Sequence, residues 1–171
     1  GIAAVATASG TAAISTTLLT LLKAGDHIVA SSSLYGGTYN LLSVTLPRHG
    51  ITTTFVDPSN PENFEAAAQE NTRAIFVESL GNPKLDVLDI EAISKHAKAH
   101  KVPLIVDNTV ATPYLLNPIK YGANIVIHSL TKYINGNGTS LGGVVIDAGN
   151  FDWTNGKFPE FTEPSPGYHG L

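Results

Sequence analysis

Short apolar runs rich in β-branched residues alternate with helix-like segments along most of this chain. The runs that we expect to form strands are residues 27–32, 52–57, 74–79, 103–108, 124–129 and 142–147. Between most of them lie helix-like segments near residues 10–23, 36–48, 61–70 and 89–101. Almost continuously apolar strands that are separated by helices are typical of a mainly parallel sheet covered on both faces. The pattern therefore predicts an α/β fold.

The last expected strand follows its predecessor after only a glycine-rich loop, too short for a helical crossover, which favours an antiparallel orientation. We expect one α/β domain over residues 1–149 and an extended loop over residues 150–171, where prolines and aromatic residues replace the periodic pattern. The chain begins inside an apolar stretch and contains no methionine. We interpret it as a fragment of a longer protein.

Composition excludes several classes of function. The 171 residues are 43% hydrophobic and carry a net charge of −4, so no broad basic surface for nucleic acid is expected. No apolar run reaches the ~20 residues that cross a bilayer, and no signal-peptide pattern is present, so no membrane association is expected. Cysteine is absent, which excludes disulfides and thiolate metal sites and is consistent with a cytoplasmic protein.

Polar and aromatic residues stand just after the expected strands. They are Tyr35 after the first, Glu78 and Asn82 after the third, Asp107, Asn108 and Thr109 after the fourth, and Ser129, Thr131 and Lys132 after the fifth. Open α/β sheets bind ligands beyond the carboxyl ends of their strands. One edge of the sheet is thus expected to collect an aromatic ring, a carboxylate, amide and hydroxyl donors, and an amine.

The start of the first helix adds an anion site to this edge. Ser9 resembles an N-cap residue, and Gly10 allows a ligand to approach the backbone closely. The exposed N–H groups and positive dipole of a helix N-terminus favour phosphate. Ser129 and Thr131 could donate hydroxyl hydrogen bonds to the same anion. Each feature also has a purely structural explanation, as a helix cap or as loop residues.

Three further residues have an equally simple structural alternative when taken alone. Asp107 could cap a turn, Tyr35 could be a core aromatic residue, and Lys132 could extend its amine into water. Together with a phosphate site they describe one cofactor, pyridoxal 5′-phosphate (PLP), bound to a lysine as a Schiff base. A nicotinamide-binding domain is the competing α/β interpretation, but no G-x-G-x-x-G follows the first strand.

The chain also resembles a known family over nearly its whole length. The stretches "SGTAAI", "SLYGGTY", "ESLGNP", "VDNTVATPYLLNPIKYGANIVIHSLTKY" and "GTSLGGVV" are similar to the Cys/Met-metabolism family of PLP-dependent enzymes, which has the aspartate-aminotransferase-like fold (fold type I). Within that family, "HSLTKYINGNGTSLGG" and "FPEFTEPSPGYHGL" most resemble the O-acetylhomoserine sulfhydrylase branch.

This resemblance implies a role for each candidate site residue. Lys132 would be catalytic, holding the cofactor covalently and moving protons. The other cofactor-binding residues would be Asp107 at the pyridinium nitrogen, Tyr35 stacked on the ring, Gly10, Thr11, Ser129 and Thr131 at the phosphate, and Asn82 and Thr109 near the ring. Asn82 would also face the substrate.

The resemblance further implies a γ-replacement reaction, in which O-acetyl-L-homoserine and sulfide give L-homocysteine and acetate, in a cytoplasmic homotetramer built as a dimer of dimers. Cystathionine γ-synthase or methionine or cystathionine γ-lyase chemistry, and a non-catalytic fragment, are the alternatives. The substrate carboxylate calls for an arginine. Neither Arg48 nor Arg73 is well placed, so the isolated chain is expected to be inactive.

His96 and His100 have a spacing that can bind a metal, but their flanking lysines favour a solvated helix face. We therefore expect no metal site.

Overall fold

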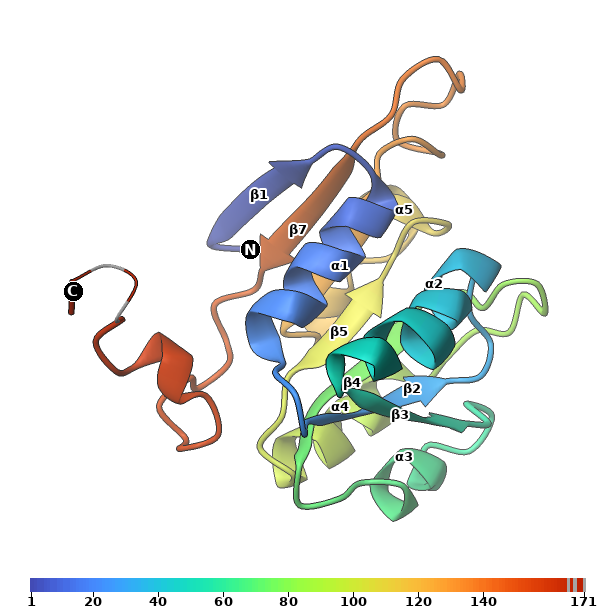
Figure 1. Cartoon of the computed structure of the whole chain (residues 1–171). Helices are drawn as coiled ribbons and strands as arrows, with labels where there is room; N and C mark the ends of the chain where they lie inside the picture. Colours follow the sequence, from blue (N-terminus) through green and yellow to red (C-terminus); the bar gives the residue numbers. More distant parts are fainter. Residues whose placement is uncertain (166, 168, 171) are drawn as a thin grey trace.

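A seven-stranded sheet forms the centre of the computed structural model, which describes residues 1–165, 167, 169 and 170 (Figure 1). The strands are β1 (Ala3–Thr7), β2 (His27–Ser31), β3 (Thr52–Val56), β4 (Thr72–Glu78), β5 (Leu104–Asp107), β6 (Ile125–Ser129) and β7 (Gly143–Asp147). Their order across the sheet is β1-β7-β6-β5-β4-β2-β3. The strands β2 to β6 pair in parallel, whereas β7 pairs antiparallel with β6 and with β1. The predicted α/β class and the antiparallel last strand are confirmed.

Helices cover both faces of this sheet. They are α1 (Gly10–Leu21), α2 (Gly36–Asn40), the π-helix η1 (Leu41–Thr45), the 3-10 helix η2 (Leu46–His49), α3 (Glu62–Ala66), α4 (Ile90–Ala99), α5 (Thr112–Leu115) and the 3-10 helices η3 (Pro118–Tyr121) and η4 (Pro159–Phe161). The segment predicted as one helix over 36–48 is helical but changes from α to π to 3-10 geometry, with Pro47 near the start of η2. Figure 1 shows α1 and α2 in front of the sheet and α4 behind it.

The central strands contribute to two hydrophobic cores, one on each face of the sheet. In β4, Phe76 packs into the core under α1, whereas its neighbours Ile75 and Val77 pack into the core under α3 and α4. In β5, Ile105 and Leu104 divide between the two cores in the same way. Because side chains alternate between the faces, a strand covered on both sides must be apolar at every position. This explains the continuous apolar runs in the sequence.

The edge strand β1 was not predicted. Its sequence, AAVAT, has three alanines, which have low strand propensity, and all of its residues are exposed except Thr7, which is partly buried. Its position depends on the antiparallel ladder with β7, which runs from Ala3 opposite Asp147 to Thr7 opposite Gly143. A tertiary contact therefore forms this strand, and the local sequence does not signal it.

Residues 150–165 follow β7 away from the sheet (Figure 1). Phe151, Trp153, Phe158 and Phe161 form an aromatic cluster with edge-to-face contacts, and Phe158 is fully buried in it. Of the remaining expected loop, Pro166, Tyr168 and Leu171 lie outside the described residues. Among the helices that the structure describes, none has the length and apolarity to cross a membrane.

Candidate active site

A pocket of about 440 Å³ opens beyond the carboxyl ends of the parallel strands. All nine residues that the sequence singled out as the cofactor site line this pocket: Gly10, Thr11, Tyr35, Asn82, Asp107, Thr109, Ser129, Thr131 and Lys132. Ser9, Glu78, Leu80 and Tyr133 also line it. The parallel topology therefore brings together residues that are up to 122 positions apart, counting from Gly10 to Lys132.

The N-terminus of α1 forms one wall of the pocket. The Ser9 hydroxyl accepts a hydrogen bond from the Ala12 amide at 3.0 Å, so Ser9 caps this helix as predicted. A Cβ atom on Gly10 would lie 2.5 Å from Cβ and 3.0 Å from Cα of Ser129, so only glycine allows α1 to begin this close to the end of β6. Within the described residues, the amides of Gly10 and Thr11 have no hydrogen-bond partner. Two free amides at a positive helix end suit an anion.

The residues after β6 add hydroxyls and an amine. Within the described part of the chain, neither the Ser129 hydroxyl nor the Lys132 amine has a protein partner. The Thr131 hydroxyl accepts a hydrogen bond from the Gly142 amide at 3.1 Å and lies 3.3 Å from the Gly142 carbonyl oxygen. Ser129 is thus the freer of the two hydroxyls that were predicted to bind phosphate.

Asp107 ends β5 as a buried carboxylate. Its Oδ1 accepts hydrogen bonds from the Thr109 amide at 3.0 Å and from the Thr109 hydroxyl at 2.5 Å, and that hydroxyl accepts one from the Ser129 amide at 2.8 Å. Among the described residues, Oδ2 has no partner. Burial raises the pKa of Asp107, although the hydrogen bonds from Thr109 oppose this effect. A cation that contacts the free oxygen would restore the charged form.

Glu78 is a second buried carboxyl group, and it was not among the predicted cofactor-binding residues. It ends β4 directly opposite Asp107 in the parallel ladder, and its Oε1 accepts a hydrogen bond from the Tyr35 amide at 2.7 Å. Burial raises its pKa to about 8, and the nearby charges of Asp107 and Asp86 act in the same direction. The sequence marked Glu78 as a strand-end residue but gave no sign that it contacts the segment after β2.

Tyr35 and Asn82 come from two loops at the rim of the pocket. Tyr35 is 51% exposed, and its ring lies against Gly37, where a Cβ atom would be 2.5 Å from the ring. The loop that carries Asn82 is closed by a hydrogen bond from the Gly81 amide to the Asp86 carbonyl at 2.9 Å. The Ser33 hydroxyl donates to the Asp86 carboxylate at 2.6 Å and ties this loop to the end of β2.

These groups fit PLP. The free amides of Gly10 and Thr11 and the free Ser129 hydroxyl suit its phosphate, and the unpartnered Oδ2 of Asp107 suits a protonated ring nitrogen. The Lys132 amine and the Tyr35 ring are groups of the kinds that make the covalent and the stacking contact with this cofactor.

The two arginines lie away from the pocket. Arg48 belongs to η2, and the Arg73 side chain pairs with Asp26 at 3.6 Å near the amino end of β4. Neither is among the residues that line the pocket. The described part of the chain therefore presents no arginine to a substrate carboxylate in this pocket.

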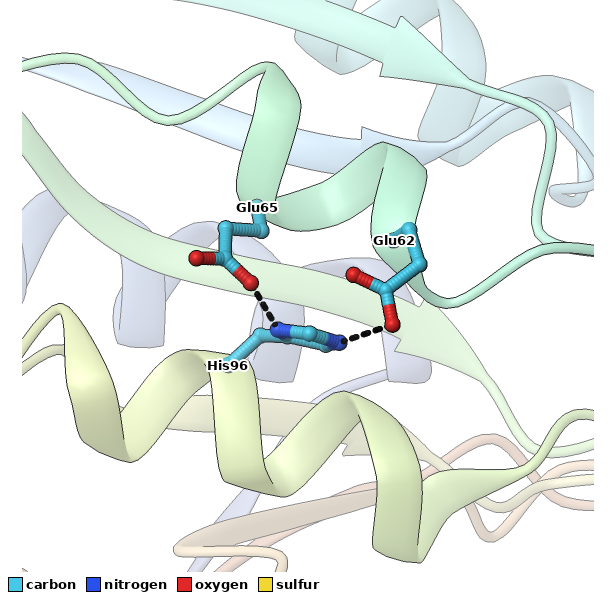
Figure 2. Close-up of side chains that lie close together, drawn as sticks. All are labelled: Glu62, Glu65 and His96. Carbon is cyan, nitrogen blue, oxygen red and sulfur yellow. Dashed lines mark ion pairs between the residues drawn. The ribbon is translucent and has the colours of Figure 1, made fainter.

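A different cluster, formed by Glu62, Glu65 and His96, joins α3 to α4 (Figure 2). His96 Nδ1 lies 2.6 Å from the Glu65 carboxylate, and Nε2 lies 3.8 Å from the Glu62 carboxylate. Figure 2 shows the two carboxylates at opposite nitrogens of the ring. One possible ligand atom from each of the three residues lies within 4.8 Å of the others, whereas His100 is not part of the cluster.

A comparison with protein families matches residues 1–162 to the model of the Cys/Met metabolism PLP-dependent enzymes. The chain belongs to this family, and PLP is its cofactor. Among similar curated proteins is the O-acetyl-L-homoserine sulfhydrylase of Leptospira meyeri, 61% identical over 100% of this chain and 39% of that protein. The homocysteine synthase of Schizosaccharomyces pombe is 56% identical over 100% of this chain and 41% of that protein.

Solved structures agree with this assignment. A protein of Campylobacter jejuni described as an O-acetylhomoserine (thiol)-lyase superposes with a TM-score of 0.95 at 43% identity, over 98% of this chain and 42% of that one. That structure contains N′-pyridoxyl-lysine-5′-monophosphate. The O-acetylhomoserine sulfhydrylase of Wolinella succinogenes superposes with a TM-score of 0.85 at 43% identity, over 94% and 46% of the two chains. The chain thus spans about two fifths of the length of these curated relatives.

Proposed function

We propose that this chain forms the cofactor-binding part of an O-acetylhomoserine sulfhydrylase. In the net reaction, the γ-carbon of O-acetyl-L-homoserine exchanges its acetoxy group for sulfur from sulfide, and homocysteine and acetate are released. The observation that carries the proposal is the convergence of Lys132, Asp107 and the free N-terminus of α1 on one pocket. The names of relatives that are 61% and 56% identical support the choice of reaction.

Lys132 and Asp107 would carry the chemistry. When bound, PLP supplies an electron sink that makes the α-proton of the amino acid acidic. Lys132 would hold the cofactor through its amine, and would then remove the α-proton and pass it on. Asp107 would keep the ring nitrogen protonated. Burial raises the pKa of the Asp107 carboxyl, so its ionisation and the binding of a cationic ring would stabilise each other.

The remaining residues would fix the position of the cofactor. The amides of Gly10 and Thr11 and the hydroxyls of Ser129 and Thr131 would bind the phosphate. Tyr35 would stack on the ring, and Asn82 would lie at its edge, next to the substrate. Thr109 would orient Asp107 through the two hydrogen bonds that it donates to Oδ1.

The site as described needs further groups from outside the chain. The substrate carboxylate requires a cation, and neither arginine of the chain lines the pocket. We propose that the rest of the enzyme supplies this arginine. We also propose a cytoplasmic homo-oligomer. Large apolar side chains that are exposed just before β1, on β1 and on α5, namely Ile2, Val5, Tyr114 and Leu115, support the oligomer, in which another part of the assembly would cover them.

The test is an assay of the full-length protein with PLP, O-acetyl-L-homoserine and sulfide, in which homocysteine is quantified. Cysteine and water serve as alternative acceptors, because cystathionine γ-synthase or γ-lyase activity would give cystathionine or 2-oxobutanoate instead. Residues 1–171 alone are expected to form no homocysteine, since they lack the arginine. Turnover by this segment near that of the full-length protein would contradict the proposed division of the site.

A further inference from the structure

Glu78 lines the pocket, yet the proposed function gives it no role. Its side chain is 5% exposed and ends β4 beside Asp107. The only hydrogen bond that its carboxyl group makes within the described residues comes from the Tyr35 amide. A buried carboxyl group is costly unless it is paired or neutral, so its presence here calls for an explanation.

We infer that Glu78 is a positioning residue, which fixes Tyr35 over the pocket by accepting a hydrogen bond from the Tyr35 amide. This inference rests on the proposed function, because it concerns the ring that would stack on PLP.

The contacts of Tyr35 show why its backbone matters. The residue immediately precedes α2, and its carbonyl accepts a hydrogen bond from the Tyr39 amide at 2.9 Å. Its ring is half exposed and packs on Gly37, so ring packing restrains it weakly. The 2.7 Å hydrogen bond to Glu78 joins the amide of Tyr35 directly to the end of a central strand. The Ser32 amide and the Ser33 hydroxyl tie earlier residues of this loop to Val56 and Asp86, and the bond to Glu78 is the contact that holds the Tyr35 amide itself.

The surroundings of Glu78 keep the group neutral. The charged groups that act on it are Asp107 on β5 and Asp86 in the loop after β4, and Lys132 lines the same pocket. Burial is the largest cause of a pKa near 8; the hydrogen bond from the Tyr35 amide opposes it, and the two aspartates add to it. A pKa of about 8 favours the protonated form of Glu78 at pH 7, which leaves Asp107 as the anion beside the ring nitrogen. A neutral acid still accepts the Tyr35 hydrogen bond through its carbonyl oxygen.

The amide of glutamine imitates this neutral acid in shape and as an acceptor. E78Q should therefore preserve the position of Tyr35, whereas E78A leaves the Tyr35 amide without its partner. If Glu78 instead transferred a proton to substrate, E78Q would lower kcat as severely as E78A does, and PLP affinity would not change in either variant.

The experiment measures the Kd of PLP for the full-length apoenzyme by titration, with wild type, E78Q, E78A, Y35A and the E78A/Y35A double variant. One neutral hydrogen bond corresponds to about a three- to tenfold change in an equilibrium constant, so E78A is expected to raise Kd by about that factor. E78Q should restore Kd to within about twofold of wild type. In the Y35A background, E78A should change Kd by less than about twofold, because the position of residue 35 affects PLP only through the ring that Y35A removes.

Two results would overturn the inference: E78Q raising Kd as much as E78A, or E78A weakening binding equally with and without the Tyr35 ring. Far-UV circular dichroism checks the fold of each variant. If E78A does not fold, the inference is tested by comparing E78Q with wild type alone. A Kd of PLP for E78Q more than about threefold above that of wild type then contradicts the inference. A homocysteine assay of the wild-type enzyme tests the proposed reaction separately. The two tests can fail independently, because PLP affinity does not depend on which acceptor the enzyme uses.

Discussion

Replacing Gly10 with alanine is expected to push the N-terminus of α1 away from the end of β6. The new Cβ atom would lie 2.5 Å from Cβ and 3.0 Å from Cα of Ser129, whereas carbon atoms pack at about 3.5–4.0 Å. The backbone must therefore separate by roughly 1 Å. Overpacking of this kind costs about 1–3 kcal/mol of stability. The free amides of Gly10 and Thr11 would move by a similar distance relative to Ser129.

Gly36→Ala provides a matched control. Gly36 is the first residue of α2, as Gly10 is of α1, and a Cβ atom on Gly36 would have no neighbour within 4 Å. Both substitutions gain the same helix propensity, about 0.5–1 kcal/mol. The difference between the two variants therefore isolates the contact with Ser129.

The measurements are urea unfolding of the full-length apoprotein and the Kd of PLP. Gly10→Ala should be less stable than Gly36→Ala by about 1–3 kcal/mol and should bind PLP at least about tenfold more weakly, because the phosphate donors no longer converge. Equal stability and equal Kd in the two variants would show that Gly10 is not needed for the approach of α1 to β6, and would remove the phosphate role of this helix end.

Three further predictions concern the ionisable groups of the pocket. Lys132→Ala should abolish homocysteine formation and covalent retention of PLP after borohydride reduction while leaving the circular dichroism spectrum intact, and near-normal turnover would refute this assignment. Asp107→Asn should weaken PLP binding and slow α-deuterium exchange far more than Asp107→Glu does, because a neutral amide cannot hold the ring proton; an exchange rate equal to wild type would exclude Asp107 from that role. Glu78 has a folded-state pKa of about 8 against an ordinary 4.5, so the folded state binds more protons between these values and stability is lost as pH rises from 4.5 to 8. Relative to E78Q, the wild-type apoprotein should lose roughly 3 kcal/mol between pH 4.5 and 7, at about 1.4 kcal/mol per pH unit, and a pH-independent difference in unfolding free energy would contradict this value.

The fold was predictable where burial determines the sequence. Strands covered on both faces must be almost continuously apolar, and this pattern located the inner strands within a few residues, whereas β-branched residues located the edge strand β3. The pattern fails for β1, whose alanines carry no strand signal and whose pairing with β7 depends on residues about 140 positions away. It also fails to show that the helix over 36–48 changes geometry twice, since hydrophobic spacing does not report which hydrogen bonds close each turn.

The pocket was predictable because parallel strands bring their carboxyl ends to one edge. This rule, the start of the first helix and the family resemblance together gave nine of the residues that line the pocket, although their roles remain predictions. It could not reveal that Thr109 links the carboxylate of Asp107 to the Ser129 amide, or that Glu78 contacts Tyr35. Such contacts depend on the register between neighbouring strands and on loop conformation, neither of which the spacing of residues in the sequence determines.

The contact between Gly10 and Ser129 also sets an order of events during synthesis. The two residues are 119 positions apart, from 10 to 129. The strand β1 can pair only after β7, which ends at Asp147, has been synthesised. Ribosomes add about 5–20 residues per second, so roughly 6–24 seconds separate the emergence of the two halves of the phosphate site. In that interval α1 has no β6 to lie against. The phosphate site can therefore form only after Ser129 has left the ribosome.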